Sequence, residues 1–300
     1  MPVPADNAIT KLRVELGKLL FYDERLSGDG STSCGSCHVL SSAFTDGRKT
    51  SPGFNGNFGK RNAPTLANLA WSPRLMMEGG VHSLEMQVLA PAIDTNEMNI
   101  SITRRAEELN KDERLNKLSR ASYNRDLDPY VIVRAIASFE RTLISGDSRY
   151  DHFQYFNEPG ALNDEETRGM ELFFSDSLSC SSCHSGVFFT DNGYYNIGLY
   201  SEYEDKGLRR VTYNENDVGK FKVPTLRNIE LTAPYMHDGS LNTLEEVIDF
   251  FNEGGLGHVN QDRRIRPLHL NESQKKDLIA FLKTLTDWNF VQNAAFLPNH

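Results

Sequence analysis

The sequence has no long apolar segment and few cysteines, and its basic residues are outnumbered by acidic ones. The most apolar stretch, residues 130–144, is interrupted by charged residues, whereas a membrane helix needs about 20 consecutive apolar residues. We therefore expect no membrane span. With 41 acidic against 32 basic residues the net charge is −9, which disfavours nucleic acid as a ligand. A chain of 300 residues that is 39% hydrophobic and 24% charged is typical of a globular protein of two domains.

The four cysteines form two strings of the same pattern, and none is left over. The strings are Cys34-Gly35-Ser36-Cys37-His38 and Cys180-Ser181-Ser182-Cys183-His184. In a c-type haem site both thiols form thioethers with the porphyrin, and the adjoining histidine binds the iron. We therefore predict two covalently bound haem c groups, with His38 as the iron ligand of haem 1 and His184 as that of haem 2.

Zinc sites and redox-active dithiols also use Cys-x-x-Cys pairs, but both fit this sequence less well. Zinc ribbons generally lack a histidine directly after each pair, and no strand-rich βαβ pattern precedes either string. Haem attachment in c-type cytochromes takes place outside the bacterial cytoplasm, so we expect a periplasmic or cell-surface protein. Residues 1–7 lack a basic region followed by an apolar one, and we expect the secretion signal to be absent from this chain.

The hydrophobic pattern predicts a mainly α-helical fold with little β structure. Helices are expected at residues 9–22, 83–89, 102–109, 129–144, 163–174, 243–252 and 272–286. Asn163 is the predicted N-cap of one of them, and three acidic residues follow it where they interact favourably with the helix dipole. Strand signals are limited to residues 187–200 and 209–213.

Short segments of the first half recur in the second half with one constant offset of 160 positions. Residues 63–68 match 223–228, residues 76–79 match 236–239, and residues 83–85 match 243–245. We therefore predict two cytochrome c-like haem domains related by internal duplication, residues 1–158 and 159–300. The boundary is expected in the turn-rich segment 157–160.

The same offset pairs two helices that we expect to cover the distal faces of the haems. It sets Gln87 against Val247 and Pro91 against Phe251. A proline cannot bind iron, and Gln87 offers a polar amide. We therefore predict an open, five-coordinate haem in the N-terminal domain, with space for a small oxidant.

With these strings, the chain resembles the di-haem bacterial cytochrome c peroxidase and MauG family over essentially its whole length. Further likeness lies in residues 60–65, 80–98, 233–239 and 279–285. The resemblance implies an oxidoreductase that uses hydrogen peroxide to form high-valent iron at haem 1, shares the oxidising equivalents with haem 2 and oxidises a partner. It also implies that Gln87 and Glu97 assist cleavage of the O–O bond, with Glu97 carrying the proton.

The resemblance further implies a calcium ion between the domains. Its ligands would be Asn62 and backbone carbonyls of Thr232 and Pro234, which are the oxygen donors that a hard cation prefers. On sequence alone an asparagine such as Asn62 is more often a turn residue, and the calcium ion rests on the resemblance.

Three positions depart from the family pattern. Peroxide-scavenging members close the resting haem 1 with a histidine from residues 50–60, but this segment has none, so we expect no reductive activation of that type. Phe251 replaces the methionine or tyrosine that binds haem 2, so haem 2 must recruit another ligand or stay open. Met236 and His237 are the candidate ligands; the alternative is that His237 hydrogen-bonds a propionate and Met236 only packs. Met77 replaces a tryptophan that commonly lies between the haems.

The absent histidine makes the chain more similar to MauG and the methanobactin-associated di-haem enzymes, which oxidise residues of another protein. The alternative within the family is a cytochrome c peroxidase that detoxifies hydrogen peroxide with electrons from a small redox protein. A non-catalytic di-haem electron carrier would gain nothing from an open iron beside Gln87 and Glu97. A haem-based sensor would need a signalling module, for which the chain has no room.

Overall fold

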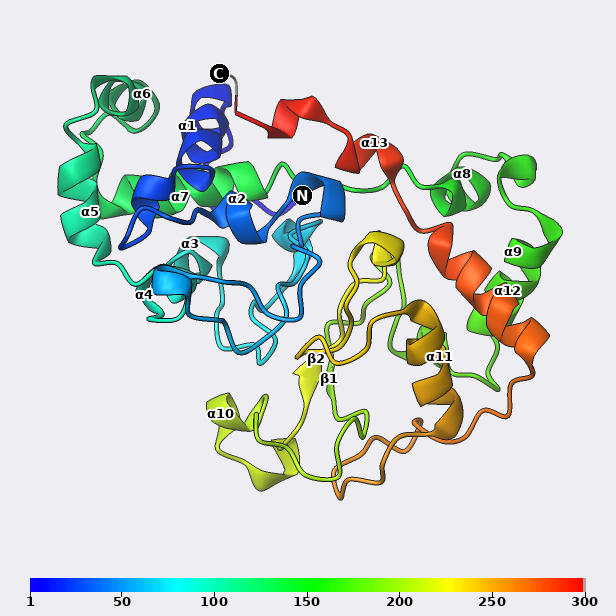
Figure 1. Ribbon diagram of the computed structural model, residues 1–300. Coiled ribbons are helices and arrows are strands. Elements are labelled where there is room, and N and C mark those ends of the chain that lie inside the picture. The colour runs from blue at the N-terminus through cyan, green and yellow to red at the C-terminus, as the bar shows by residue number, and fades with distance from the viewer. Residues whose placement is uncertain (299–300) are drawn as a thin grey trace. The chain divides into compact units, whose positions relative to one another are not determined.

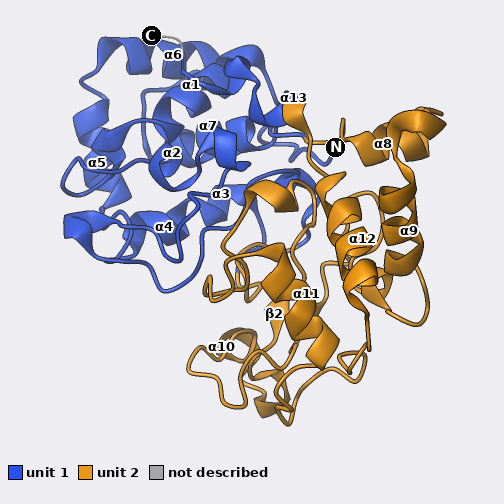
Figure 2. Cartoon of the chain, turned by 45° about the vertical axis from the view of Figure 1, so that its right-hand side comes forward, with its two compact units in different colours: residues 1–73, 81–144, 289–300 blue, residues 74–80, 145–288 orange. Residues whose placement is uncertain are grey.

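A computed structural model describes residues 1–298 of the chain, which is mainly helical with little β structure, as predicted (Figure 1). The chain divides into two compact units (Figure 2). Unit 1 comprises residues 1–73, 81–144 and the C-terminal part from Asn289, and unit 2 comprises residues 74–80 and 145–288. None of the helices within residues 1–298 has the length and apolar character needed to cross a bilayer.

Unit 1 is built around two helices, α1 and α7, that lie side by side (Figure 1). Its helices are α1 (Lys11–Phe21), α2 (Cys34–Cys37), α3 (Leu84–Gln87), α4 (Leu89–Ile93), α5 (Ile102–Leu109), α6 (Glu113–Tyr123) and α7 (Pro129–Glu140). The helix pair approaches closely because Gly17 lacks a side chain: a Cβ there would lie 1.8 Å from the carbonyl oxygen of Ala135. Helix α7 starts at Asp128, whose carboxylate accepts from the Val131 N–H, and its N1 residue is a proline.

Unit 2 repeats this helix pair with α9 and α12. Its elements are α8 (Arg149–Tyr155), α9 (Asp164–Phe173), β1 (Tyr194–Tyr195), α10 (Arg209–Thr212), β2 (Phe221–Lys222), α11 (Leu244–Glu253) and α12 (Glu272–Lys283). A Cβ on Gly169 would lie 1.9 Å from the carbonyl oxygen of Asp277, which matches the close approach in unit 1. The two short strands pair antiparallel, with Tyr194 opposite Lys222. The short helix α13 (Trp288–Val291) begins at the last residue of unit 2 and continues into unit 1.

Most predicted helices are confirmed, but one predicted strand is wrong. Helix α5 has the predicted ends, and Asn163 is the N-cap of α9, where its side chain accepts from the Glu166 N–H. Residues 209–213 form helix α10 instead of a strand, because consecutive i to i−3 and i to i−4 backbone bonds close this turn, including Tyr213 N–H to Arg209 O.

Residues 74–80 pack into unit 2, although the chain on either side of them belongs to unit 1. The Lys222 N–H donates to the Met77 carbonyl at 2.8 Å. Gly79 has a φ of 72°, and a Cβ there would lie 2.1 Å from the Tyr194 hydroxyl, so this contact requires glycine. The units divide at residues 144 and 145, and the predicted haem-domain boundary after residue 158 stays a prediction.

Candidate haem and peroxide sites

The first Cys-x-x-Cys-His string folds as one short helical turn that brings its three functional side chains together. Cys34 and Cys37 begin and end α2, and His38 is the C-cap, with its N–H donating to the Cys34 carbonyl at 2.9 Å. The Nδ1 atom of His38 lies 2.8 Å from the carbonyl oxygen of Phe44. This contact assigns the N–H to Nδ1 and leaves the Nε2 lone pair for a metal.

The second string has the same arrangement in unit 2. The His184 N–H donates to the Cys180 carbonyl at 3.0 Å, and Nδ1 of His184 lies 3.1 Å from the carbonyl oxygen of Phe189. Burial lowers the pKa of both His38 and His184, so both imidazoles are neutral near pH 7. Each string therefore presents two thiols and a neutral, oriented imidazole, and none of the four cysteines forms a disulfide. This donor set fits a haem c group.

The loops behind the two strings also match. The hydroxyl of Thr65 donates to the Ala43 carbonyl at 2.6 Å, and that of Thr225 donates to the Phe188 carbonyl at 2.6 Å. Asn68 and Asn228 both adopt left-handed backbone conformations, with φ values of 61° and 62°. Thus the segments that share the sequence offset of 160 also share local geometry.

Gln87 and Pro91 lie on one face of a nearly continuous helical stretch. Helices α3 and α4 meet at Val88, which itself has helical dihedral angles. Residues four positions apart on a helix are neighbours on its surface, so the amide and the proline ring point the same way. Both residues are half-buried.

Glu97 lies on the loop that follows α4 and is held by its backbone. The Phe54 N–H donates to the Glu97 carbonyl at 2.6 Å, and a Cβ on Gly53 would lie 2.7 Å from the Glu97 Cα, so glycine is needed for this contact. The residue is exposed to solvent, but the surrounding protein partly desolvates the carboxyl. This desolvation and then the negative charge of Asp94 raise the pKa of Glu97.

The Glu97 carboxyl lies within electrostatic reach of the first haem string. Its charge contributes to raising the pKa of the Cys34 and Cys37 thiols, for which burial is the largest cause. Unit 1 thus combines a candidate haem c site with a carboxyl whose pKa is raised towards neutrality, as general acid–base catalysis requires.

Comparisons with known proteins decide the family. The sequence profile of the di-haem cytochrome c peroxidases matches residues 11–158. Cytochrome-c peroxidase IdrP1 of Pseudomonas sp. (strain SCT) is 35% identical over 324 residues, covering 95% of this chain and 84% of the relative. The methylamine utilization protein MauG of Methylorubrum extorquens is 34% identical, covering 95% of this chain and 81% of the relative. The chain belongs to the di-haem cytochrome c peroxidase and MauG family.

Solved structures agree with this membership. The crystal structure of a MauG-like protein associated with microbial copper homeostasis superposes with a TM-score of 0.94 at 36% identity, covering 99% of this chain and 97% of that one. The di-haem peroxidase BthA of Burkholderia thailandensis has the same fold, with a TM-score of 0.82 at 24% identity. As a member of this family the chain is a di-haem, c-type, peroxidase-type oxidoreductase. Membership of this peroxidase family implies hydrogen peroxide as the oxidant.

At the positions that the sequence offset pairs with Gln87 and Pro91, the second half of this di-haem peroxidase carries apolar residues. Val247 and Phe251 lie four positions apart on α11 and are both half-buried and apolar. The ring of His237 stacks on Phe221, with the ring centroids 3.9 Å apart and an interplanar angle of 18°. Met236 adopts a left-handed φ of 74°. Whether Met236 or His237 binds haem 2 stays a prediction.

The predicted calcium residues fall in both units. Asn62 is in unit 1, where its amide N–H donates to the Arg48 carbonyl at 2.8 Å and its amide oxygen keeps acceptor capacity. Thr232 and Pro234 are in unit 2, and the bond between Ala233 and Pro234 is cis. The calcium site stays a prediction.

Two buried polar side chains near the first haem string were not predicted. Glu140, at the end of α7, is 4% exposed, and its Oε2 has no hydrogen-bond partner within residues 1–298. The Tyr22 hydroxyl is also buried without a partner in the described part of the chain, and burial raises the pKa of Tyr22 to about 12. The sequence signal for Glu140 was an acidic residue within the mostly apolar segment 130–144.

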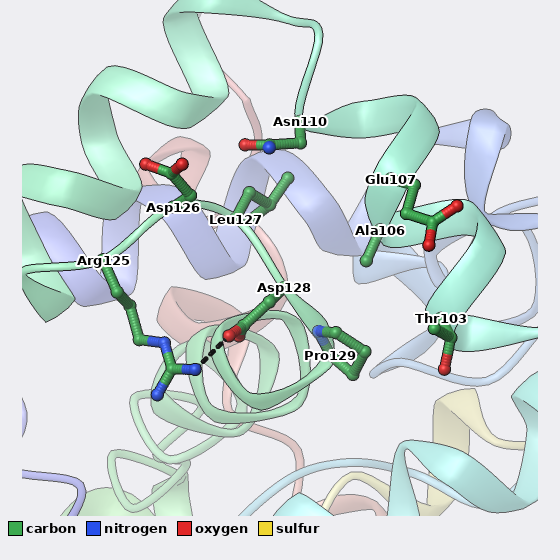
Figure 3. A pocket seen from close by; sticks show the side chains of 9 residues that line it. All are labelled: Thr103, Ala106, Glu107, Asn110, Arg125, Asp126, Leu127, Asp128 and Pro129. Atoms are coloured by element: carbon green, nitrogen blue, oxygen red, sulfur yellow. Dashed lines mark hydrogen bonds and ion pairs between the residues drawn. The ribbon is translucent and has the colours of Figure 1, made fainter.

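A surface pocket of about 470 Å³ in unit 1 contains none of the predicted site residues (Figure 3). It is lined by Thr103, Ala106, Glu107, Asn110, Arg125, Asp126, Leu127, Asp128 and Pro129. Arg125 points at Asp128 and pairs with it, and Asp128 also caps α7. Arg125 and Asp128 thus hold the start of α7.

Proposed function

We propose that this di-haem enzyme uses hydrogen peroxide to oxidise a side chain of a partner protein, as MauG-like enzymes do. The observation that carries the proposal is the segment of residues 50–60. It contains no histidine, and it is closed by its own backbone, with Gly53 N–H to Asn57 O at 2.7 Å and Gly59 N–H to Ser51 O at 3.0 Å. A loop of this kind supplies no imidazole that could close haem 1 between turnovers.

We assign one haem c to each string, with thioethers to Cys34 and Cys37 in the N-terminal half and to Cys180 and Cys183 in the C-terminal half. The shared geometry of the two strings and of the loops behind them supports an internal duplication of two cytochrome c-like haem domains. His38 and His184 would bind the two irons through Nε2. The second haem would serve electron transfer, with Met236 or His237 as its further ligand because Phe251 has no donor atom.

The side chains around haem 1 would position the oxidant and move its protons. The haem supplies the metal centre that accepts oxidising equivalents from peroxide. The Gln87 amide would donate a hydrogen bond to the peroxide, and Pro91 would keep the distal face free of a protein ligand. Glu97 would take a proton from one peroxide oxygen and deliver it to the other, so that the second oxygen leaves as water.

A calcium ion held by Asn62, Thr232 and Pro234 is part of the proposal, and so is a periplasmic or cell-surface location. Asn62 supports calcium because its amide oxygen retains acceptor capacity, and oxygen donors suit a hard cation. The location is supported by the haem c chemistry of the family, which is completed outside the bacterial cytoplasm.

The test is to incubate the purified di-haem protein and peroxide with candidate exported proteins and to weigh those proteins by mass spectrometry. A MauG-like relative is associated with microbial copper homeostasis, so exported copper-binding proteins are the first candidates. The partner protein is expected to gain the mass of oxygen or to lose the mass of hydrogen, as oxidation of one of its side chains requires. A protein partner that stays unmodified while peroxide is consumed would reject the proposal.

The second candidate function is peroxide detoxification with electrons from a small redox protein. It is favoured by relatives named cytochrome-c peroxidases, including IdrP1 and the cytochrome c551 peroxidase of Nitrosomonas europaea at 36% identity. Rapid catalytic oxidation of a reduced small cytochrome by peroxide, without prior reduction of the enzyme, would support this candidate instead.

A further inference from the structure

Glu140 is a buried carboxyl that the peroxide chemistry does not use. It ends α7, is 4% exposed, and its Oε2 has no hydrogen-bond partner within residues 1–298. Helix α7 is fixed against α1 by the close approach of Gly17 to Ala135. The carboxyl is therefore held in the interior of unit 1.

Within residues 1–298, Glu140 forms no ion pair with a basic side chain. The adjoining Arg141 directs its guanidinium to Glu85 of α3, with contacts of 2.7 and 3.0 Å, and Asn7 donates to the same carboxylate at 2.8 Å. An unpaired buried carboxylate is costly, so the neutral form is favoured.

The charged and titratable groups acting on Glu140 are few. They are Arg141, Glu85 and the Cys34 thiol of α2. Burial raises the pKa of Glu140 to about 8. The charge of Arg141 opposes this rise with a smaller effect, and the charge of Glu85 adds to it. After burial, the charge of Glu140 is the largest influence on the pKa of Cys34, which it raises, so the carboxyl acts on the first haem-binding sulfur.

Unit 2 shows that the fold does not need a carboxyl at this position. In unit 1 the Phe139 Cβ lies 3.0 Å from a Cβ built on Gly17. In unit 2 the Phe281 Cβ lies 2.9 Å from a Cβ built on Gly169, so the two phenylalanines occupy matching positions. The residue that follows Phe281 is Leu282, which is 5% exposed. An apolar side chain thus fills the matching buried space in unit 2, and Glu140 is present for a reason other than packing.

We propose that Glu140 is a redox-linked proton site of haem 1 and thereby tunes the potential of that haem. The proposal rests on attachment of haem 1 to Cys34 and Cys37, as assigned above. In the pH range where the oxidised protein holds Glu140 as a carboxylate, reduction of haem 1 by an external one-electron donor is accompanied by uptake of one proton from solvent at Glu140. When the electron leaves, the proton leaves with it. The net charge beside Cys34 is then the same in both states, which a poorly solvated site favours.

The experiment is a spectroelectrochemical titration of the intact di-haem protein from about pH 6 to about pH 10, which brackets the pKa of Glu140. One of the two haem potentials is expected to fall as the pH rises. The slope of this fall should approach the value for one proton taken up per electron. Glu140→Gln and Glu140→Leu should abolish that dependence, and Glu140→Asp should retain a dependence. Glu113→Gln, at an exposed glutamate of the same unit, is the matched control and should behave as wild type.

Infrared difference spectra between the oxidised and reduced protein give a second measurement. A band of a protonated carboxyl is expected in the wild type and should be missing in Glu140→Gln. A Gln variant with the wild-type pH dependence, or with the wild-type band, would overturn the proposal; if this variant does not fold, the Leu variant decides in the same way. Haem content by absorbance and mass is measured first, and a protein with no haem on Cys34 and Cys37 would reject the haem assignment and this inference with it.

Discussion

Unit 1 and unit 2 each present a Cys-x-x-Cys-His string on one helical turn, but the helices expected over the two haems differ in chemistry. In unit 1 the stretch formed by α3 and α4 carries Gln87 and Pro91, whereas α11 of unit 2 carries Val247 and Phe251. The features the units share are those that can hold a haem. The features in which they differ are those that can make one haem react with peroxide and leave the other to carry electrons.

The buried charges of the two units are also placed differently. In unit 1, Arg141 pairs with Glu85 in the first turn of α3. In unit 2, Arg227 is 1% exposed and pairs with Asp151, while its Nε–H donates to the Val187 carbonyl at 2.8 Å, in the loop after the second haem string. The two buried ion pairs therefore hold different segments, the start of α3 in unit 1 and the loop after the second haem string in unit 2.

The largest expected effect comes from removing the carboxyl that unit 1 alone is proposed to use. Glu97→Gln should slow the reaction of the ferric protein with peroxide by about 10²- to 10⁴-fold, because proton transfer by a positioned side chain contributes that much. The change of the Soret band in a stopped-flow experiment measures the rate. Glu113→Gln is the control and should react as wild type. Equal rates in Glu97→Gln and wild type would remove the proton-transfer role.

The next effect tests the ion pair of unit 2. Asp151→Ala leaves the Arg227 guanidinium buried without its carboxylate and should lower the free energy of unfolding by about 3–5 kcal/mol. The matched control is Asp126→Ala, which removes an exposed pair with Arg120 and should cost less than about 1 kcal/mol. Chemical denaturation of the holoprotein measures both. A loss in the first variant no larger than in the control would contradict the structural role of the buried pair.

The third prediction converts one position of unit 1 to the residue of unit 2. An unfolded glutamate releases its proton near pH 4.5, whereas Glu140 keeps it until about pH 8. The folded state therefore loses stability as the pH rises between these values, by about 3 kcal/mol at pH 7. Glu140→Leu should remove this penalty, so the variant should be more stable than wild type at pH 7 and similar to it near pH 4.5. Thermal unfolding at the two pH values measures the difference, and a variant that is equally destabilised at both would contradict it.

The sequence was sufficient for elements whose signal is local. The pattern of α5 and the N-cap at Asn163 depend on residues that are neighbours in the chain, and the structure confirms both. Each haem string likewise folds as one short turn, as its spacing suggests. Helices α6 and α8 were not predicted because their apolar positions are sparse, although Asp112 and the capping box of Ser148 mark their starts.

Features that depend on contacts between distant segments could not be predicted in the same way. The packing of residues 74–80 into unit 2 is fixed by Lys222 and Tyr194, which lie far away in the sequence. The burial of Glu140 depends on how α7 packs on α1, and a sequence pattern gives no measure of that. The match between Glu140 and Leu282 depends in the same way on the packing of the second helix pair, α9 on α12.

The smallest expected effect sharpens the role of Glu97 through its neighbour. If Glu97 acts as the base, the rate of the peroxide reaction should rise with pH through its raised pKa. The charge of Asp94 contributes to that raised pKa, so Asp94→Asn should lower it and move the rise to lower pH. Below the pKa the variant should then be faster than wild type, by less than about tenfold, and above it the two should agree. A profile that does not move, or one that still rises in the Glu97→Gln/Asp94→Asn double variant, would show that another group sets the pH dependence.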